Sequence, residues 1–148
     1  MHLKKRLLKD LNTRWNTDGK KILAKLGTIA AHRKALLAIY MNKTDNNIIL
    51  EADAELSSTL PQPPNKSCYL GGWIIPPQIT KAGQKMNVHP KKGMNDIEYG
   101  KFSVLMAHSL FIKTFEESMV LFQTTITESI KHYDVHLIDM EFFKYYYY

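Results

Sequence analysis

Residues 20–56 read KKILAKLGTIAAHRKALLAIYMNKTDNNIILEADAEL, and within them the spacing of the apolar residues changes once. Over residues 20–41 the apolar side chains recur every three or four positions, which predicts an amphipathic helix. Over residues 48–56 they occupy every second position, beginning with Ile48 and Leu50, which predicts a half-buried strand. A helix followed closely by a strand indicates a fold that contains both kinds of element.

The sequence before this stretch predicts a further helix. Five apolar residues recur there at helical spacing: Leu3, Leu7, Leu8, Leu11 and Trp15. Residues 16–19, Asn-Thr-Asp-Gly, then favour a break with capping chemistry. The N-terminus is basic and amphipathic like a mitochondrial presequence, but such peptides are rich in serine and the first serine here is Ser57. A structural helix is therefore favoured, and mitochondrial targeting stays an alternative.

The middle of the chain is rich in turn-forming residues. All six prolines lie between Pro61 and Pro90. Between two of the proline clusters, residues 68–75 form a short apolar run that predicts a strand, kinked or bulged at Gly71 and Gly72. Residues 78–100 carry no regular pattern, so we expect an exposed, basic loop there.

The last 48 residues contain neither glycine nor proline, which favours long regular structure. Six apolar residues predict a helix of about five turns, since they step by three and four: Phe111, Phe115, Met119, Phe122, Ile126 and Ile130. After it, Tyr133, Val135 and Leu137 alternate with polar residues, and the alternation slips at Ile138. This pattern predicts a terminal strand with a bulge.

Together these elements predict an α+β fold with two N-terminal helices, a small and mostly antiparallel sheet, and a long C-terminal helix followed by a terminal strand. At 148 residues the chain is expected to form a single domain. Its three parts are a basic helical arm (1–43), a strand and Pro/Gly-rich loop region (44–100), and a long helix with an aromatic terminal strand (101–148).

Positive charge is concentrated in the first part. Eleven of the twenty lysines and arginines lie in residues 1–43, against two acidic residues, while the rest of the chain is net negative. Such a surface attracts nucleic acid or an acidic protein face. The candidate nucleic-acid-binding residues are Lys20, Lys21, Lys25, His32, Arg33 and Lys34. Two other interpretations stay open, a solvated helix face and a face covered by the chain's own acidic segments, 44–66 and 101–148.

His132, Asp134 and His136 form an H-x-D-x-H triplet. Alternate residues of a strand share one face, so on the predicted terminal strand all three side chains would converge on one metal ion. On a helix, His132 and His136 alone would chelate. The alternative is that the triplet is simply the wet face of the strand.

Six of the last seven residues are aromatic, and we regard them as candidate interface residues: Phe142, Phe143, Tyr145, Tyr146, Tyr147 and Tyr148. An exposed aromatic strand promotes aggregation, whereas aromatic side chains are common at the centres of protein interfaces. Packing of this strand onto the chain's own helices is the alternative.

Cys68 is the only cysteine, which excludes an internal disulfide and favours a reducing compartment such as the cytoplasm. A nucleophilic pair of Cys68 with His89 or His108 is conceivable, but a cysteine within an apolar run is more often buried and inert. No segment approaches the roughly 20 apolar residues that cross a bilayer. No cofactor motif is present, so we expect no cofactor.

From these observations we expect a non-enzymatic basic subunit of a larger, oligomeric assembly without membrane contact. Its partner would be structured nucleic acid or an acidic protein surface, bound through the N-terminal helices. One alternative is a small metal-dependent hydrolase or nuclease toxin that uses the H-x-D-x-H triplet. Another is a purely structural component, like those of virions or ribosomes.

Overall fold

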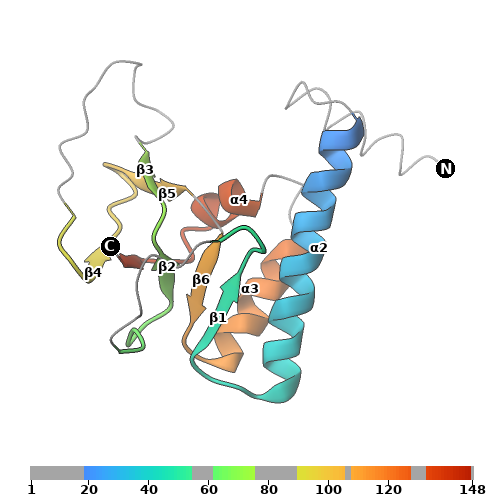
Figure 1. The fold of residues 1–148 in the computed structure, drawn as a ribbon, viewed down its shortest axis with the longest axis horizontal. Coiled ribbons are helices and arrows are strands. Elements are labelled where there is room, and N and C mark those ends of the chain that lie inside the picture. Colours follow the sequence, from blue (N-terminus) through green and yellow to red (C-terminus); the bar gives the residue numbers. More distant parts are fainter. Residues whose placement is uncertain (1–18, 55–61, 76–89, 106–107, 128–132, 148) are drawn as a thin grey trace.

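The computed structural model of the protein describes residues 19–54, 62–75, 90–105, 108–127 and 133–147 (Figure 1). These residues contain helices and strands in the order α2 (Gly19–Asn42), β1 (Asn47–Leu50), β2 (Cys68–Leu70), β3 (Trp73–Ile75), β4 (Met94–Asp96), β5 (Ser103–Leu105), β6 (Ser109–Ile112), α3 (Phe115–Thr127), α4 (Tyr133–Asp139) and β7 (Tyr145–Tyr147). The α+β class is therefore confirmed. The second predicted helix corresponds to α2, and the first, at residues 3–15, lies outside the described residues.

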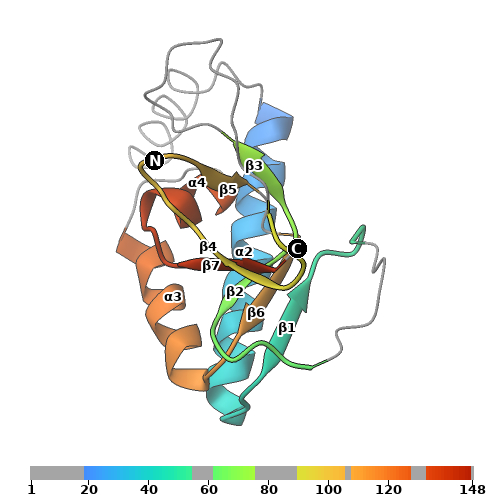
Figure 2. The same ribbon diagram turned by 90° about the vertical axis from the view of Figure 1, so that its left-hand side faces the viewer.

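Five of the strands form one mixed sheet in the order β1-β6-β2-β7-β4. Strands β2 and β7 are parallel, and the other neighbours in this sheet are antiparallel. Strands β3 and β5 form a separate antiparallel pair. Elements far apart in sequence thus become neighbours, since β7 at the C-terminus lies between β2 and β4 (Figure 2).

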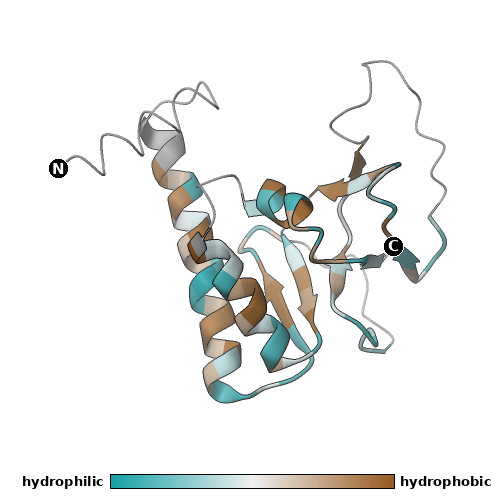
Figure 3. Ribbon diagram, turned by 180° about the vertical axis from the view of Figure 1, so that it is seen from behind, coloured by the Kyte–Doolittle hydropathy of each residue, from teal (hydrophilic) through white to brown (hydrophobic). Residues whose placement is uncertain are grey.

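Helices α2 and α3 cover one face of the five-stranded sheet (Figures 1 and 2). The core lies between the two layers: Leu36 and Ile39 of α2 and Leu121 of α3 meet Ile49, Tyr69, Leu110, Ile112 and Tyr146 of the sheet. Figure 3 shows this arrangement from behind, with hydrophobic residues in β1 and β6 next to the helices. No helix in the described part of the chain is long and apolar enough to span a membrane.

Strand β1 is shorter than predicted, and it buries the opposite set of side chains. Ile49 is 8% exposed, whereas Ile48 and Leu50 are 45% and 43% exposed. The helix layer explains the difference, because Ile49 pairs with Leu110 on the face that α2 covers. After Leu50 the chain turns, and the amide of Ala54 donates to the carbonyl of Glu51 at 3.0 Å. The strand predicted to run to residue 56 therefore ends at Leu50.

The predicted kink at Gly71 and Gly72 is present, and it divides the run into β2 and β3, which belong to different sheets. Both glycines have positive φ, 97° and 122°. At Gly72 a Cβ atom would lie 2.6 Å from Cγ1 of Val104, so both the backbone conformation and the space there require glycine. In the loop predicted over residues 78–100, strand β4 and the burial of Ile97, which follows it, are features that the sequence did not indicate.

The prediction of one long C-terminal helix was wrong. Phe111 lies in β6, and α3 begins only at Phe115. The start of α3 is set by a capping box: Oγ1 of Thr114 accepts from the amide of Glu117 at 3.3 Å, and Oε2 of Glu117 accepts from the amide of Thr114 at 3.2 Å. Oδ1 of Asp45 also accepts from the amide of Phe115, at 3.1 Å. These bonds satisfy donors at the helix terminus and stop the helix from extending back to Phe111.

The strand predicted from Tyr133 was also wrong, because residues 133–139 form helix α4. The buried side chains there include Tyr133, His136 and Leu137, at positions i, i+3 and i+4. That spacing is helical, although Tyr133, Val135 and Leu137 also satisfy an alternating pattern. The terminal strand β7 is confined to Tyr145–Tyr147.

Candidate metal centre

The candidate nucleic-acid-binding residues of α2 do not share one exposed face. Lys25 and His32 are buried, and the guanidinium of Arg33 lies over the ring of Phe122 of α3, 5.3 Å from its centroid. Lys34 is exposed. The side chains of Lys20 and Lys21 lie outside the described part of the structure. Arg33, which the sequence places near the middle of the apolar stripe, is thus accommodated between the two helices.

Asp134 and His136 do not converge as a metal pair would. They are two residues apart on helix α4, which separates them by about 200° around its axis. His136 is buried, with Nε2 3.1 Å from Oγ1 of Thr124, and Oδ1 of Asp134 accepts from the amide of Val135 at 2.8 Å. His132 lies outside the described residues. The three side chains could converge on one ion only if they lay on a strand, whereas Asp134 and His136 lie on a helix.

The terminal aromatic residues pack largely within the protein itself. Phe143 and Tyr146 are buried in the core, and Phe142 packs against it. Tyr145 and Tyr147 of β7 are half-buried, and Nζ of Lys66 donates to the hydroxyl of Tyr145 at 2.5 Å. Tyr148 lies outside the described residues. An interface role for these residues stays a prediction, and two of them already have a core role.

Cys68 is fully buried, and burial raises the pKa of its thiol to about 12, so it is protonated at neutral pH. In the sheet Cys68 pairs with Phe111, three residues away from His108. The ring of His108 is instead bound to Glu51. His89, the other candidate partner, lies outside the described residues. The inert interpretation of Cys68 therefore has physical support.

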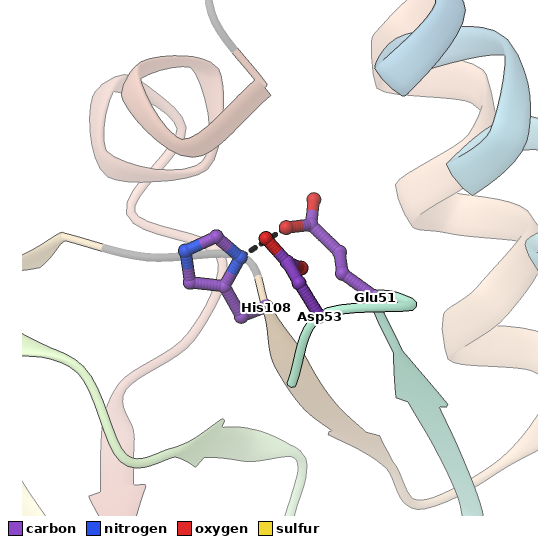
Figure 4. Close-up of side chains that lie close together, drawn as sticks. All are labelled: Glu51, Asp53 and His108. Atoms are coloured by element: carbon purple, nitrogen blue, oxygen red, sulfur yellow. Dashed lines mark hydrogen bonds and ion pairs between the residues drawn. The ribbon is translucent and has the colours of Figure 1, made fainter. Parts of the chain in front are cut away.

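Three potential metal ligands meet where β1 ends and β6 begins: Glu51, Asp53 and His108 (Figure 4). Glu51 follows β1, His108 precedes β6, and the amide of Glu51 donates to the carbonyl of His108 at 2.8 Å. Asp53 belongs to the turn after Glu51. One ligand atom from each of the three residues lies within 4.8 Å of the others. Nδ1 of His108 directly contacts Oε2 of Glu51.

A fourth side chain, His32 of α2, supports this cluster from the core. Its Nε2 lies 3.3 Å from Oε1 of Glu51, and its ring stacks on Tyr133 with the centroids 4.1 Å apart. Burial lowers the pKa of His32, and hydrogen bonding to Glu51 opposes that shift only in part. Nδ1 of His32 is buried without a hydrogen-bond partner among the described residues. The neutral tautomer that donates from Nε2 to Glu51 is therefore favoured.

The cluster lies at one end of an open groove of about 420 Å³ between α2 and the end of β1. Gly27, Ala31 and Ala35 of α2 line one wall, and Ile49, Glu51 and Asp53 line the other. Three of the five α2 residues in this wall are glycine or alanine, the others being Thr28 and His32, so the groove has room for a ligand next to the carboxylates. Glu51 and Asp53 thus belong both to the cluster and to the groove.

The chemistry of the three side chains suits a divalent transition metal. Imidazole and carboxylate ligands bind Zn²⁺ at about 2.0–2.2 Å, so two ligand atoms on one ion lie at most about 4.4 Å apart. The ligand atoms of the three residues lie within 4.8 Å of one another, and side-chain rotations that also separate Nδ1 of His108 from Oε2 of Glu51 would arrange them around one ion. Three protein ligands with further coordination positions open are typical of catalytic rather than structural zinc sites.

The sequence did not single out this cluster. Glu51 and Asp53 were interpreted as the polar side of a strand, and His108 was considered only as a partner for Cys68. The one local signal is E-x-D at the end of an apolar strand, and its histidine lies 55 residues further along the chain. Only the antiparallel pairing of β1 with β6 brings His108 to Glu51.

No protein-family model, curated protein or solved structure matches this chain.

Proposed function

We propose that this protein is a metal-dependent hydrolase whose ion is bound by Glu51, Asp53 and His108. The observation that carries the proposal is the convergence of these three ligands at the end of the groove between α2 and β1. This site differs from the H-x-D-x-H triplet that the sequence suggested. The proposed reaction, metal-dependent hydrolysis, is the one that the sequence offered as an alternative. The groove supplies the space that a substrate needs beside the ion.

The ligand set supports catalysis better than a purely structural role. Glu51 and His108 are partly exposed, and Asp53 is exposed, so an ion on them retains positions for water or substrate. A divalent ion in such a site lowers the pKa of a coordinated water toward 7 and supplies a nucleophile at neutral pH. In hydrolysis, the oxygen of water bonds to the acyl or phosphoryl centre, the bond from that centre to the leaving group breaks, and the leaving group takes up a proton.

His32 serves as a positioning residue in this proposal. By donating from Nε2 to Oε1 of Glu51, it fixes one carboxylate oxygen and leaves Oε2 directed toward His108. Hydrogen bonds of this kind orient metal ligands, and their loss typically lowers metal affinity by about 10–100-fold. The stacking of His32 on Tyr133 holds the imidazole ring in the orientation that this bond needs.

Calorimetric titration with Zn²⁺, Mn²⁺ and Mg²⁺ tests the metal site, and p-nitrophenyl acetate, bis-(p-nitrophenyl) phosphate and casein test the reaction class. We expect one metal ion per chain, with affinity reduced at least tenfold in His108→Ala and Asp53→Asn. Asp96→Asn is the matched control, because Asp96 is an exposed aspartate on β4, away from the cluster. Metal binding that is absent, or that survives both ligand substitutions, contradicts the proposal.

Binding of structured nucleic acid or of an acidic protein surface, within a larger assembly, is our second candidate function. It rests on the excess of positive charge in residues 1–43, of which Lys34 is exposed on α2. We also propose a reducing compartment such as the cytoplasm, since Cys68 is a free thiol.

A further inference from the structure

We infer that the groove between α2 and β1 binds an extended peptide segment, which lies along the edge of β1. The inference rests on the proposed function, because it names peptides as the substrate class of the metal-dependent hydrolase. Its evidence is separate, since it comes from the shape and charge of the groove rather than from the metal ligands.

The last two residues of β1, Ile49 and Leu50, and the three residues that follow the strand form one wall of the groove. Successive side chains of a strand point to opposite faces of the sheet, yet both Ile49 and Leu50 border the groove. We therefore place the groove beside the edge of β1, at its C-terminal end. Among the described strands β1 pairs with β6 alone, so its outer N–H and C=O groups have no strand partner there. Such an edge pairs readily with an added strand.

Five residues of α2 line the groove, and three of them, Gly27, Ala31 and Ala35, have no side-chain atom beyond Cβ; the other two are Thr28 and His32. Gly27, Ala31 and Ala35 are four residues apart and lie on one face of the helix, over a length of about 12 Å. An extended chain covers that length with about four residues. At Gly27 a Cβ atom would meet nothing within 4 Å, so the groove is open at this point.

The charge of the groove favours a peptide over a nucleic acid. Among the described residues that line it there is no lysine or arginine, while Glu51 and Asp53 stand at one end. With an ion on these carboxylates their charge is balanced, but the rest of the groove lining still offers no cation to pair with a phosphate backbone, whereas a peptide main chain is uncharged and needs none. A peptide on the edge of β1 also reaches Glu51, at the cluster. Hydrolysis would then join the water oxygen to a peptide carbonyl carbon, break the C–N bond and transfer a proton to the departing amine.

The test begins with selection from a phage-displayed library of random linear dodecapeptides on the full-length protein in EDTA, so that binding is measured without metal. Ala31→Phe fills the groove. Ala30→Phe is its matched control, because Ala30 is also an exposed alanine, one residue away, that does not line the groove. We expect selected peptides to bind at least tenfold more weakly to Ala31→Phe and within twofold of wild type to Ala30→Phe. N-methylation of alternate peptide amides should weaken binding in one register and not in the other.

The inference is overturned if no peptide distinguishes Ala31→Phe from Ala30→Phe. It is also overturned if a random 12-nucleotide RNA pool binds more weakly to Ala31→Phe than to Ala30→Phe while no peptide does so. An unchanged urea denaturation midpoint of Ala31→Phe in EDTA shows that the variant is folded, independently of metal binding. Peptides that bind by these criteria but are not cleaved after Zn²⁺ is added support the peptide groove and contradict the hydrolase, so the two proposals fail separately.

Discussion

Nε2 of His32 lies 3.3 Å from Oε1 of Glu51, and this contact joins the middle of α2 to the end of β1. His32 is 3% exposed, so the contact forms largely out of water. One interpretation of the basic N-terminal part is that the acidic segment 44–66 lies against it. Glu51 of that segment contacts His32 of the basic part. The contact also fixes the carboxylate that our metal proposal requires.

A double-mutant cycle over His32→Ala and Glu51→Ala should give a coupling free energy of about 1–2 kcal/mol. The reason is that a hydrogen bond to a charged group is stronger when it is shielded from water. The measurement is urea denaturation of the three variants and the wild type in EDTA at pH 7.5.

The pair Lys144 and Glu141 provides the control for this cycle. Its N–O distance is also 3.3 Å, but both side chains are more than half exposed. Its coupling should be at most about 0.5 kcal/mol. Equal coupling in the two pairs would show that burial of His32 adds nothing to the Glu51 contact.

The pKa of Cys68 predicts a loss of stability at high pH. The unfolded chain releases the thiol proton near pH 9, whereas burial holds it in the folded protein up to about pH 12. Rising pH therefore favours the unfolded chain, and the free energy of unfolding should fall by about 1.4 kcal/mol per pH unit within that window. Below pH 8 the thiol should contribute no pH dependence.

Urea denaturation of wild type and Cys68→Ala between pH 8 and 10.5 measures this slope. Buried Tyr69 and Tyr133 also have raised pKa values, but they are common to both proteins and cancel in the difference. Iodoacetamide at pH 8 should leave the native thiol unmodified. Rapid native-state alkylation, or parallel slopes, would mean that Cys68 is accessible.

The sequence was informative where one pattern had one structural solution. The apolar spacing of residues 20–41 matches α2, and Gly71-Gly72 marks a break that positive φ values require. It misled where one pattern fits two structures. Tyr133, Val135 and Leu137 alternate as in a strand, but the burial of Tyr133, His136 and Leu137 belongs to a helix.

Two further features were missed, the start of α3 for a local reason and the candidate metal centre for a long-range reason. The start of α3 is written in the sequence as Thr114-Phe115-Glu116-Glu117, a capping box, which is a stronger boundary signal than the apolar stripe that continues through it. The candidate metal centre has no comparable signal in the sequence. Glu51 and His108 become neighbours only through the pairing of β1 with β6, a non-local event that the spacing of residues does not encode.

The second candidate function predicts salt-dependent binding to duplex DNA or RNA through the basic segment. Replacement of Lys20, Lys21 and Lys34 by alanine should lower the slope of log K against log salt by about 2–3, if each lysine contacts a phosphate. Lys25 is unsuitable for this test because it is buried. Fluorescence anisotropy between 50 and 300 mM salt, about the range in which such contacts dominate, measures the slope.

The control for this experiment removes the same charge elsewhere. Lys91, Lys92 and Lys101 are exposed and lie outside the basic segment, so their replacement by alanine should leave the slope nearly unchanged. Equal effects of the two triple variants would indicate a general response to net charge. Absence of binding at low salt would remove nucleic acid as a partner.

The terminal aromatic residues yield a prediction that separates a core role from an interface role. Tyr146 is 2% exposed and pairs with Tyr69 on one side and Asn95 on the other, whereas Tyr145 is half-buried. Tyr146→Ala should therefore lower the free energy of unfolding by about 3–5 kcal/mol, because it leaves a large cavity in the core. Tyr145→Ala, the matched control, loses the contact with Lys66 and should cost about 1 kcal/mol.

Urea denaturation gives these values, and sedimentation equilibrium of the same samples gives the mass in solution. A loss of that size is a large part of the 5–15 kcal/mol that stabilises a typical domain, so Tyr146→Ala should unfold at markedly lower urea whatever the oligomeric state. The opposite result, unchanged stability together with a smaller mass in solution, would assign Tyr146 to an interface between chains and contradict its place in the core.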